Sequence, residues 1–416
     1  MKVLLFASKS RDYKYLKSIY SELVRRGHDA FFLYTEENIT QAPYHGKDMP
    51  NKFFYDCSDS NFDFTDGVKF TPFEILPYIP FSPDYLILNR ERWEPEQTII
   101  RCFKEEFENG KIGYVEVNAE FYTVIVNRLE SLSRIKPPQN QIDILFEQSE
   151  FILNARKSTV EWDKWDNSVV VGNPCYDDLM DELKDGDVYD KLSKTYDIDK
   201  SKKQILFFSV VNIDRPVTLD LLRNLAEKCG DGYQIFYKPF PGEPTSWPKD
   251  FNPNFLVDGV QVIYNHLDLF PMYHLCDIHI GTISSVNYPS LLLNKKVVNT
   301  HNFCKHIDAG NDFDVYERNE DWLHGTGDLN LWLRVHDLPD FESFKELVGV
   351  ERVEKFKKHN ESVKKIISEA TYDYDMDLKF LEDDTPKDYS KLLKIFDEYN
   401  DGKASERIVD VLEKSL

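Results

Sequence analysis

The sequence predicts an α/β protein made of two doubly wound domains in tandem. Short apolar runs alternate with segments of helical spacing, and this alternation stops at a highly charged stretch, 181–203, and then starts again. Parallel strands need a crossover between them, so the alternation implies parallel sheets with helices on their faces. The 416 residues, 41% of them hydrophobic, are too many for one compact domain and enough for two cores.

The first half of the chain opens with an apolar run at 3–7, and Leu16, Ile19 and Leu23 then show helical spacing. Residues 38–83 show no clear periodicity. Further strands are expected at "DYLILN", "KIGYVEV", "DILFEQS" and "SVVVGNP", with a helix "EQTIIRCFKEEFENG". We expect an N-terminal Rossmann-like domain over 1–180.

In the second half, strands are expected at "QILFFSV", "YQIFYK", "GVQVIY", "DIHIG" and "KKVVNT". This pattern predicts a second α/β domain over 204–340, joined to the first by a linker at 181–203. Residues 341–416 show helical patterning, and Thr385-Pro386 is a helix-start signal. We expect this last segment to pack across the domains.

Composition limits the function classes. The net charge of −22 disfavours binding to nucleic-acid backbones or anionic membranes. The N-terminal apolar run is shorter than the core of a signal peptide, and no stretch approaches the roughly 20 apolar residues of a membrane span. We therefore expect a cytoplasmic protein with no stable membrane insertion, and the scattered cysteines favour reduced thiols.

Several known site motifs are missing from the sequence. There is no GxxxxGK[ST], no GxGxxG after the first strand and no GxSxG. The histidines form no HxxxH-type pair with an acidic partner on a clear helix, so no metal site is expected. ATP hydrolysis by a P-loop, dinucleotide binding and α/β-hydrolase chemistry are each disfavoured.

The stretch "HIGTISSVNYPSLLLNKKVV" joins a late strand to a helix through small polar residues. Its hydroxyls and backbone N–H groups are suited to a pyrophosphate at the helix N-terminus, but Ser and Thr also cap helices without any ligand. Because ligands of open α/β sheets bind at strand ends, other strand-end residues are candidates too. The candidate binding residues are Lys238, Gly281, Thr282, Ser284, Ser285, Asn287, Ser209, Gly172, Asn173 and His266.

Two of these candidates have a plain structural alternative. Lys238 follows a strand, where it can contact a second phosphate or lie solvated beside a turn. Gly172 permits close approach of backbone to a ligand, and a tight turn explains it equally well. His266 is a candidate hydrogen-bonding group.

Four acidic residues near strand ends are candidates for a general base. Each can equally be a solvated or partnered acid. The candidates are Glu116, Glu120, Asp12 and Glu91.

The order of "SVVVGNPCYDDL", "KKQILFFSV", "KPFPGE" and "LDLFPMYHLCDIHIGTISSVNYPSLLLNKKVV" resembles the GT-B glycosyltransferase superfamily. The resemblance covers roughly residues 111–300 and is closest to CDP-glycerol glycerophosphotransferases and surface-carbohydrate transferases, with UDP-N-acetylglucosamine 2-epimerases also similar. It implies two Rossmann-like domains facing a cleft, with C-terminal helices.

The resemblance also implies roles for single residues. The turn formed by Gly281, Thr282, Ser284 and Ser285 matches the turn that holds the donor diphosphate, and Glu116 falls where the epimerases have a catalytic glutamate. Phe240 stands where relatives have a histidine near the phosphate. Asn287 and its neighbours stand where epimerases carry an acid for the ribose, which argues against an epimerase.

The function implied is an inverting, metal-independent glycosyltransferase with a nucleotide-diphosphate sugar as donor and no tightly bound cofactor. The acceptor is a hydroxyl group of a glycan or of modified phage DNA. The alternatives are a polyol-phosphate transferase that uses a CDP-alcohol and a non-catalytic nucleotide-sugar-binding protein.

Overall fold

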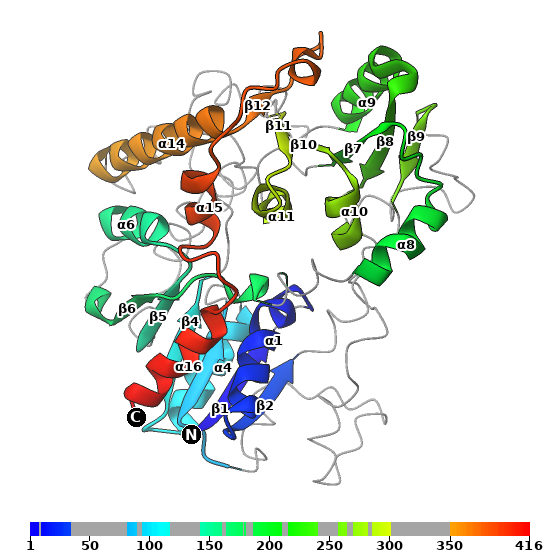
Figure 1. Cartoon of the computed structure of the whole chain (residues 1–416). Coiled ribbons are helices and arrows are strands. Elements are labelled where there is room, and N and C mark those ends of the chain that lie inside the picture. The colour runs from blue at the N-terminus through cyan, green and yellow to red at the C-terminus, as the bar shows by residue number, and fades with distance from the viewer. Residues whose placement is uncertain are drawn as a thin grey trace. The chain divides into compact units, whose positions relative to one another are not determined.

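The computed structural model contains two compact α/β units (Figure 1). It describes residues 1–7, 10–34, 81–89, 94–116, 142–159, 164–177, 179, 186–209, 215–239, 257–263, 269–281, 285–300 and 350–416. The first unit contains the helices and strands up to Met180 and also the C-terminal residues from Ile395 to Leu416. The second unit contains the helices and strands between Asp181 and Lys394.

The first unit is built on a six-stranded parallel sheet in the order β2-β1-β3-β4-β5-β6. Its strands are β1 (Lys2–Ala7), β2 (Asp29–Tyr34), β3 (Tyr85–Leu88), β4 (Lys111–Val115), β5 (Ile144–Glu147) and β6 (Ser168–Val170). Its helices are α1 (Ser10–Arg25), α4 (Glu94–Glu106), α6 (Glu150–Thr159) and α16 (Ala404–Lys414). The strand order reverses between β1 and β3, as in a doubly wound fold.

Alternating strand residues of this sheet enter two separate cores. Val3 and Leu5 pack with α1 and with Ile408 of α16, whereas Leu4 and Phe6 pack with α4 on the opposite face. Successive side chains of a strand point to opposite faces, so a buried parallel strand must be apolar on both. This explains the unbroken apolar runs in the sequence.

The second unit is built on another six-stranded parallel sheet, in the order β12-β11-β10-β7-β8-β9. Its strands are β7 (Lys203–Phe208), β8 (Tyr233–Lys238), β9 (Val260–Val262), β10 (Ile278–Gly281), β11 (Lys296–Asn299) and β12 (Tyr372–Asp373). Its helices are α8 (Gly186–Thr195), α9 (Arg215–Cys229), α10 (Leu269–Leu275), α11 (Tyr288–Leu292), α14 (Val350–Ala370) and α15 (Ser390–Phe396), the last of which crosses the boundary between the units.

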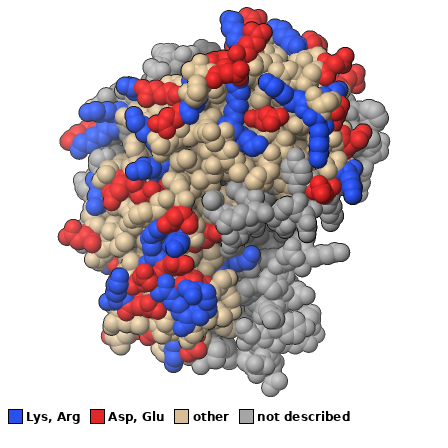
Figure 2. Space-filling model, in the orientation of Figure 1, with Lys and Arg blue, Asp and Glu red and all other residues tan. Residues whose placement is uncertain are grey.

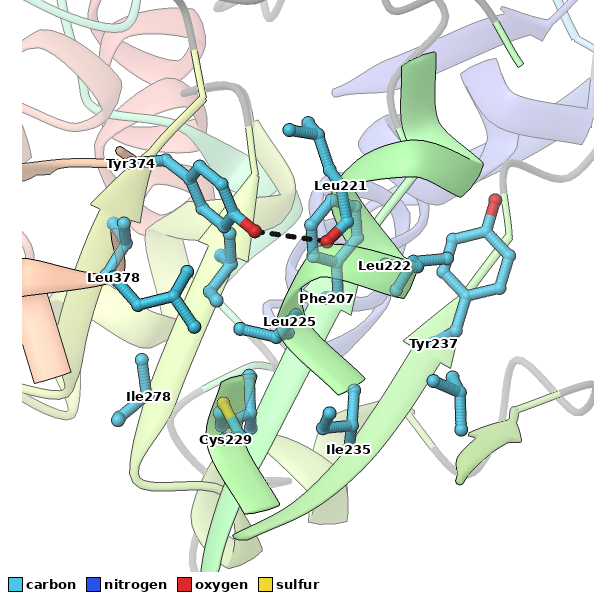
Figure 3. Close-up of a cluster of buried hydrophobic side chains, with 14 of the residues drawn as sticks. Phe207, Leu221, Leu222, Leu225, Cys229, Ile235, Tyr237, Ile278, Tyr374 and Leu378 are labelled. Atoms are coloured by element: carbon cyan, nitrogen blue, oxygen red, sulfur yellow. Dashed lines mark hydrogen bonds between the residues drawn. The ribbon is translucent and has the colours of Figure 1, made fainter. Parts of the chain in front are cut away.

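Counted from its first strand, the second sheet has the Rossmann order 3-2-1-4-5-6, which reverses between β7 and β10. One face is covered by α9, whose Leu221 and Leu225 pack against Phe207 and Tyr237 (Figure 3). The hydroxyl of the buried Tyr374 donates to the Leu221 carbonyl over 3.0 Å. The two sheets confirm the predicted α/β class with two Rossmann-like units.

Two features differ from local sequence expectations. The charged stretch 181–203, expected as a linker, contains α8, and Leu192 of this helix is buried. The helix expected from Thr385-Pro386 begins at Ser390 instead, where Asp388 accepts from the Ser390 N–H over 2.9 Å. The Tyr389 hydroxyl, directly before the helix, donates to the Lys295 carbonyl over 2.7 Å.

The surface carries both signs of charge. On the face shown in Figure 2, basic and acidic side chains are interspersed over the described residues. Among the helices that the structure describes, none has the length and apolar character needed to cross a bilayer.

Candidate functional site

Three strand ends meet at the reversal of the second sheet. The parallel register places Gly281 at the end of β10 beside Phe208 at the end of β7, and the Ser209 N–H donates to the Lys238 carbonyl over 2.9 Å. We call this edge, marked by Ser209, Lys238 and Gly281, the switch-point edge. Ligands of open α/β sheets bind outside the carboxyl ends of the strands at such a reversal.

The packing of the two central strands leaves little room for a side chain at Gly281. A Cβ at this position would lie 3.2 Å from the Phe208 Cβ and 3.5 Å from the Phe208 carbonyl oxygen. Both atoms are fixed by the β7 backbone. The contact explains the glycine through strand packing, independently of any close approach by a ligand.

Gly281→Ala is expected to lower the free energy of unfolding by about 1 to 3 kcal/mol, because the added methyl group overpacks the contact with Phe208. Urea unfolding followed by circular dichroism measures this change. Gly232→Ala is the matched control in the same unit, since a Cβ there meets nothing within 4 Å. Equal effects of the two substitutions would contradict the packing explanation.

The junction after β10 is held by buried polar contacts. The Nε2 of His279 lies 3.2 Å from the Cys276 carbonyl, so this nitrogen carries the proton and Nδ1 accepts from the Ser290 hydroxyl on α11. Burial and the charge of Lys295 lower the pKa of His279 to about 3. His279 is therefore a neutral structural group that fixes α11 to β10.

A second contact fixes the short helical turn that follows the candidate diphosphate turn. The hydroxyl of Tyr273 on α10 donates to the Val286 carbonyl over 2.5 Å. Ser285 opens this 3-10 turn, which runs to Asn287, and the buried Asn287 stands at the N-cap position of α11 without capping it through its side chain. Thr282, Ser284 and His266 lie outside the described residues.

Lys238 is buried at the end of β8, and its Nζ donates to the Pro239 carbonyl over 3.3 Å. Thus the switch-point edge brings together Ser209, Lys238 and Gly281. Ser285 and Asn287 come four and six positions after Gly281 in the chain. Burying an ammonium group costs free energy unless it is partnered. Because Lys238 is 5% exposed, it is not the solvated lysine of the alternative explanation.

In the first unit, Glu116 lies in a buried charged cluster that we define as Glu116, Glu147 and Arg156. The Arg156 Nη1 lies 2.6 Å from the Glu116 Oε2, and its Nε lies 3.1 Å from the Glu147 Oε1. The Tyr114 hydroxyl donates to the Glu116 Oε2 over 3.0 Å. Arg156 and Glu147 are 0% exposed and Glu116 is 4% exposed.

The cluster fixes the charge of its cation. Burial acts to lower the pKa of Arg156, but the charges of Glu116 and Glu147 outweigh burial and raise it. Sequence patterns did not single out Arg156 or Glu147. A signal was present: Glu147 ends an apolar strand as Glu116 does, and Arg156 follows Ile152 at helical spacing on the buried side of α6.

The other candidate acids are less well defined. Asp12 lies in the first turn of α1, and Glu91 and Glu120 lie outside the described residues. Their roles stay predictions.

Gly172 packs closely against the C-terminal segment of the first unit, and Asn173 contacts Gln148, which also bonds to that segment. A Cβ on Gly172 would lie 2.7 Å from the Asp397 Oδ1, and the Asn173 amide lies 3.4 Å from the Gln148 Oε1. Gln148 in turn accepts the Glu398 N–H through its backbone carbonyl, over 3.0 Å. This packing accounts for both residues by contacts within the unit, while their role toward a ligand stays a prediction.

Among the residues placed by the structure, no group of three or more His, Cys, Asp or Glu side chains is arranged to hold a metal ion. The four described cysteines, Cys102, Cys175, Cys229 and Cys276, form no disulfide.

No protein-family model matches this chain, and no curated protein matches it either. Solved structures do match its fold. UDP-GlcNAc 2-epimerase from Neisseria meningitidis, bound to UDP-GlcNAc, is 14% identical with a TM-score of 0.52, and the match covers 100% of both chains.

Two further structures match over the whole of this chain. The wall teichoic acid polymerase TagF is 13% identical with a TM-score of 0.51 and 89% of its chain covered, and S. aureus MnaA in complex with UDP is 14% identical with a TM-score of 0.52 and 96% covered. At such low identity the likeness shows the fold alone. The chain therefore has the GT-B type of fold, with two Rossmann-like units, as the sequence predicted.

Proposed function

We propose that this protein is a transferase that uses a nucleotide-diphosphate sugar and passes the sugar to a hydroxyl acceptor, with inversion and without a metal ion. The observation that carries the proposal is the switch-point edge, where a Gly-Thr-Ile-Ser-Ser run follows β10 at the reversal of the second sheet. The matched epimerase and MnaA structures contain UDP-GlcNAc and UDP, which supports a nucleotide donor.

The proposed reaction is a single displacement. The acceptor oxygen attacks the anomeric carbon, the bond from that carbon to the diphosphate oxygen breaks, and the acceptor proton passes to the Glu116 carboxylate. Backbone N–H groups and hydroxyls of 281–285, with Lys238, stabilise the charge that develops on the leaving nucleoside diphosphate. The net charge of −22 favours a glycan acceptor over DNA.

The donor is tested by thermal shift with UDP-, GDP- and CDP-linked donors. One of them is expected to raise the melting temperature, because a ligand at about 100 times its Kd stabilises the folded state by about 2.7 kcal/mol. Lys238→Gln is expected to lose at least half of that shift. Lys194→Gln, an exposed lysine on α8 of the same unit, is the matched control and keeps it.

Product analysis separates the proposal from its alternative. Release of a nucleoside diphosphate supports sugar transfer, whereas release of a nucleoside monophosphate from a CDP-alcohol indicates polyol-phosphate transfer. If no donor shifts the melting temperature or is broken down, the proposed function is wrong. A shift without breakdown would indicate a binding protein.

A further inference from the structure

The ends of β4 and β5 place two glutamates side by side in the first unit. The register pairs Val115 with Phe146, and the Glu116 N–H donates to the Phe146 carbonyl over 2.8 Å, so Glu116 and Glu147 occupy neighbouring positions. By strand alternation both side chains share the sheet face of Tyr114. Two like charges in neighbouring strands repel, and burial strengthens the repulsion.

Arg156 lies between these two carboxylates. It reaches Glu116 through Nη1 and Glu147 through Nε, so its planar fork engages two acids at once. A lysine ammonium is a single point charge and cannot reproduce this geometry. The guanidinium thus fixes both position and charge at this edge.

The three members of the cluster differ in exposure. Only Glu116 retains any, at 4%, while Arg156 and Glu147 have none. A buried ion cluster seldom stabilises a fold more than well-packed apolar residues of the same volume would. The cluster lies at the carboxyl ends of parallel strands, where ligands bind in open α/β sheets, and this place points to a role in the chemistry of Glu116, the least completely buried of the three.

We infer that Arg156 is a positioning residue that holds the Glu116 carboxylate in place as an anion, with Glu147 anchoring the guanidinium. The inference rests on the proposed function, in which Glu116 accepts the acceptor proton. Among the residues that the structure describes, Tyr114 from β4 and Arg156 from α6 contact Glu116, and Glu147 from β5 lies at the neighbouring strand end and shares the same guanidinium. Of these, Arg156 favours the charged form that a base needs.

The test compares Arg156→Met and Arg156→Lys with Arg26→Met in steady-state kinetics with the donor identified by thermal shift. Arg156→Met is expected to lower kcat at least about 100-fold at neutral pH, with the donor KM within about twofold, because the Glu116 carboxylate is no longer held in position while the donor site is unchanged. The acid limb of its pH profile moves upward by about one pH unit or more. Arg156→Lys keeps the positive charge, so both its loss of kcat and the upward move of its acid limb are expected to be smaller than in Arg156→Met.

Arg26→Met is the matched control for a purely structural ion cluster. Arg26 joins α1 to α16 through Glu22, Asp410 and Glu413, so its loss lowers stability and leaves kcat and the pH profile unchanged. If the Arg156 variants behave like this control, the inference is overturned. If Arg156→Met does not fold, the kcat and pH profile of Arg156→Lys are compared with those of Arg26→Met instead.

A second readout keeps this inference separate from the proposed function. In protein carrying 13C-labelled glutamate, the Glu116 carboxyl signal is identified by its loss in Glu116→Gln. It is expected to titrate at higher pH in Arg156→Lys than in the wild type. If no donor is turned over, the function fails while this titration still decides the inference, and an unchanged titration refutes it.

Discussion

Gly172→Ala is expected to lower the free energy of unfolding of the first unit by about 2.5 to 5 kcal/mol. At φ +91° an L-residue costs about 1 to 2 kcal/mol, and the added Cβ would lie 2.7 Å from the Asp397 Oδ1. That oxygen accepts the N–H groups of Tyr399 and Asn400 over 3.0 and 3.1 Å, and losing one hydrogen bond to a buried charged group costs about 1.5 to 3 kcal/mol.

Urea unfolding measures the total change, and amide hydrogen exchange in α16 shows whether the C-terminal segment detaches first. Gly27→Ala is the matched control in the same unit. Its φ is +80°, but a Cβ there meets nothing within 4 Å, so only the backbone strain remains. Equal losses in the two variants would show that the contact with Asp397 carries no energy.

Local patterns predicted the elements that bury apolar residues. The helical spacing of Leu16, Ile19 and Leu23 gives α1, and all three are fully buried. The run "DIHIG" gives β10, where the imidazole of His279 takes a core position because it is neutral and hydrogen bonded. These features follow from propensity and periodicity within one segment.

Contacts between distant segments were beyond such patterns. The sequence shows that Glu116 ends a strand, but its partners Glu147 and Arg156 come from the next strand and helix. From the sequence, Gly172 is explained equally well by a turn or by contact with a ligand. Its contact with Asp397 cannot be predicted, because Asp397 is more than 200 positions away. Strand order itself is set by long-range packing, so the sequence could name candidate strand ends but not which of them lie together at the switch-point edge.

Asp177 supplies a further long-range contact, because its carboxylate caps α16 from 227 positions away. Oδ1 accepts the Ala404 N–H over 3.0 Å and Oδ2 accepts the Ser405 N–H over 2.7 Å. Burial raises the pKa of Asp177 to about 6, and the hydrogen bonds from Ser405 and Ala404 oppose this increase without cancelling it. At neutral pH Asp177 is therefore an ionised carboxylate in a buried place that disfavours its charge.

The sign of the pH dependence follows from this pKa. An unfolded aspartate titrates near about 3.9, so between about pH 4 and 6 the folded state binds more protons than the unfolded state, and stability falls as pH rises. Asp177→Asn removes the titrating carboxyl group and with it this fall in stability. The free energy of unfolding of the variant minus that of the wild type is therefore expected to increase by about 2 to 3 kcal/mol from pH 4 to pH 7.

Asp401→Asn, in the same C-terminal segment, is expected to show the opposite dependence. Burial acts to raise the pKa of Asp401, but the hydrogen bond and charge of Arg407 outweigh it and lower the pKa. Its stabilisation is present above the unfolded pKa and is lost as pH falls, so the wild type and this variant converge in acid. Urea unfolding at pH 4, 5, 6 and 7 gives both comparisons, and parallel pH curves for Asp177→Asn and the wild type would show that Asp177 is not the titrating group.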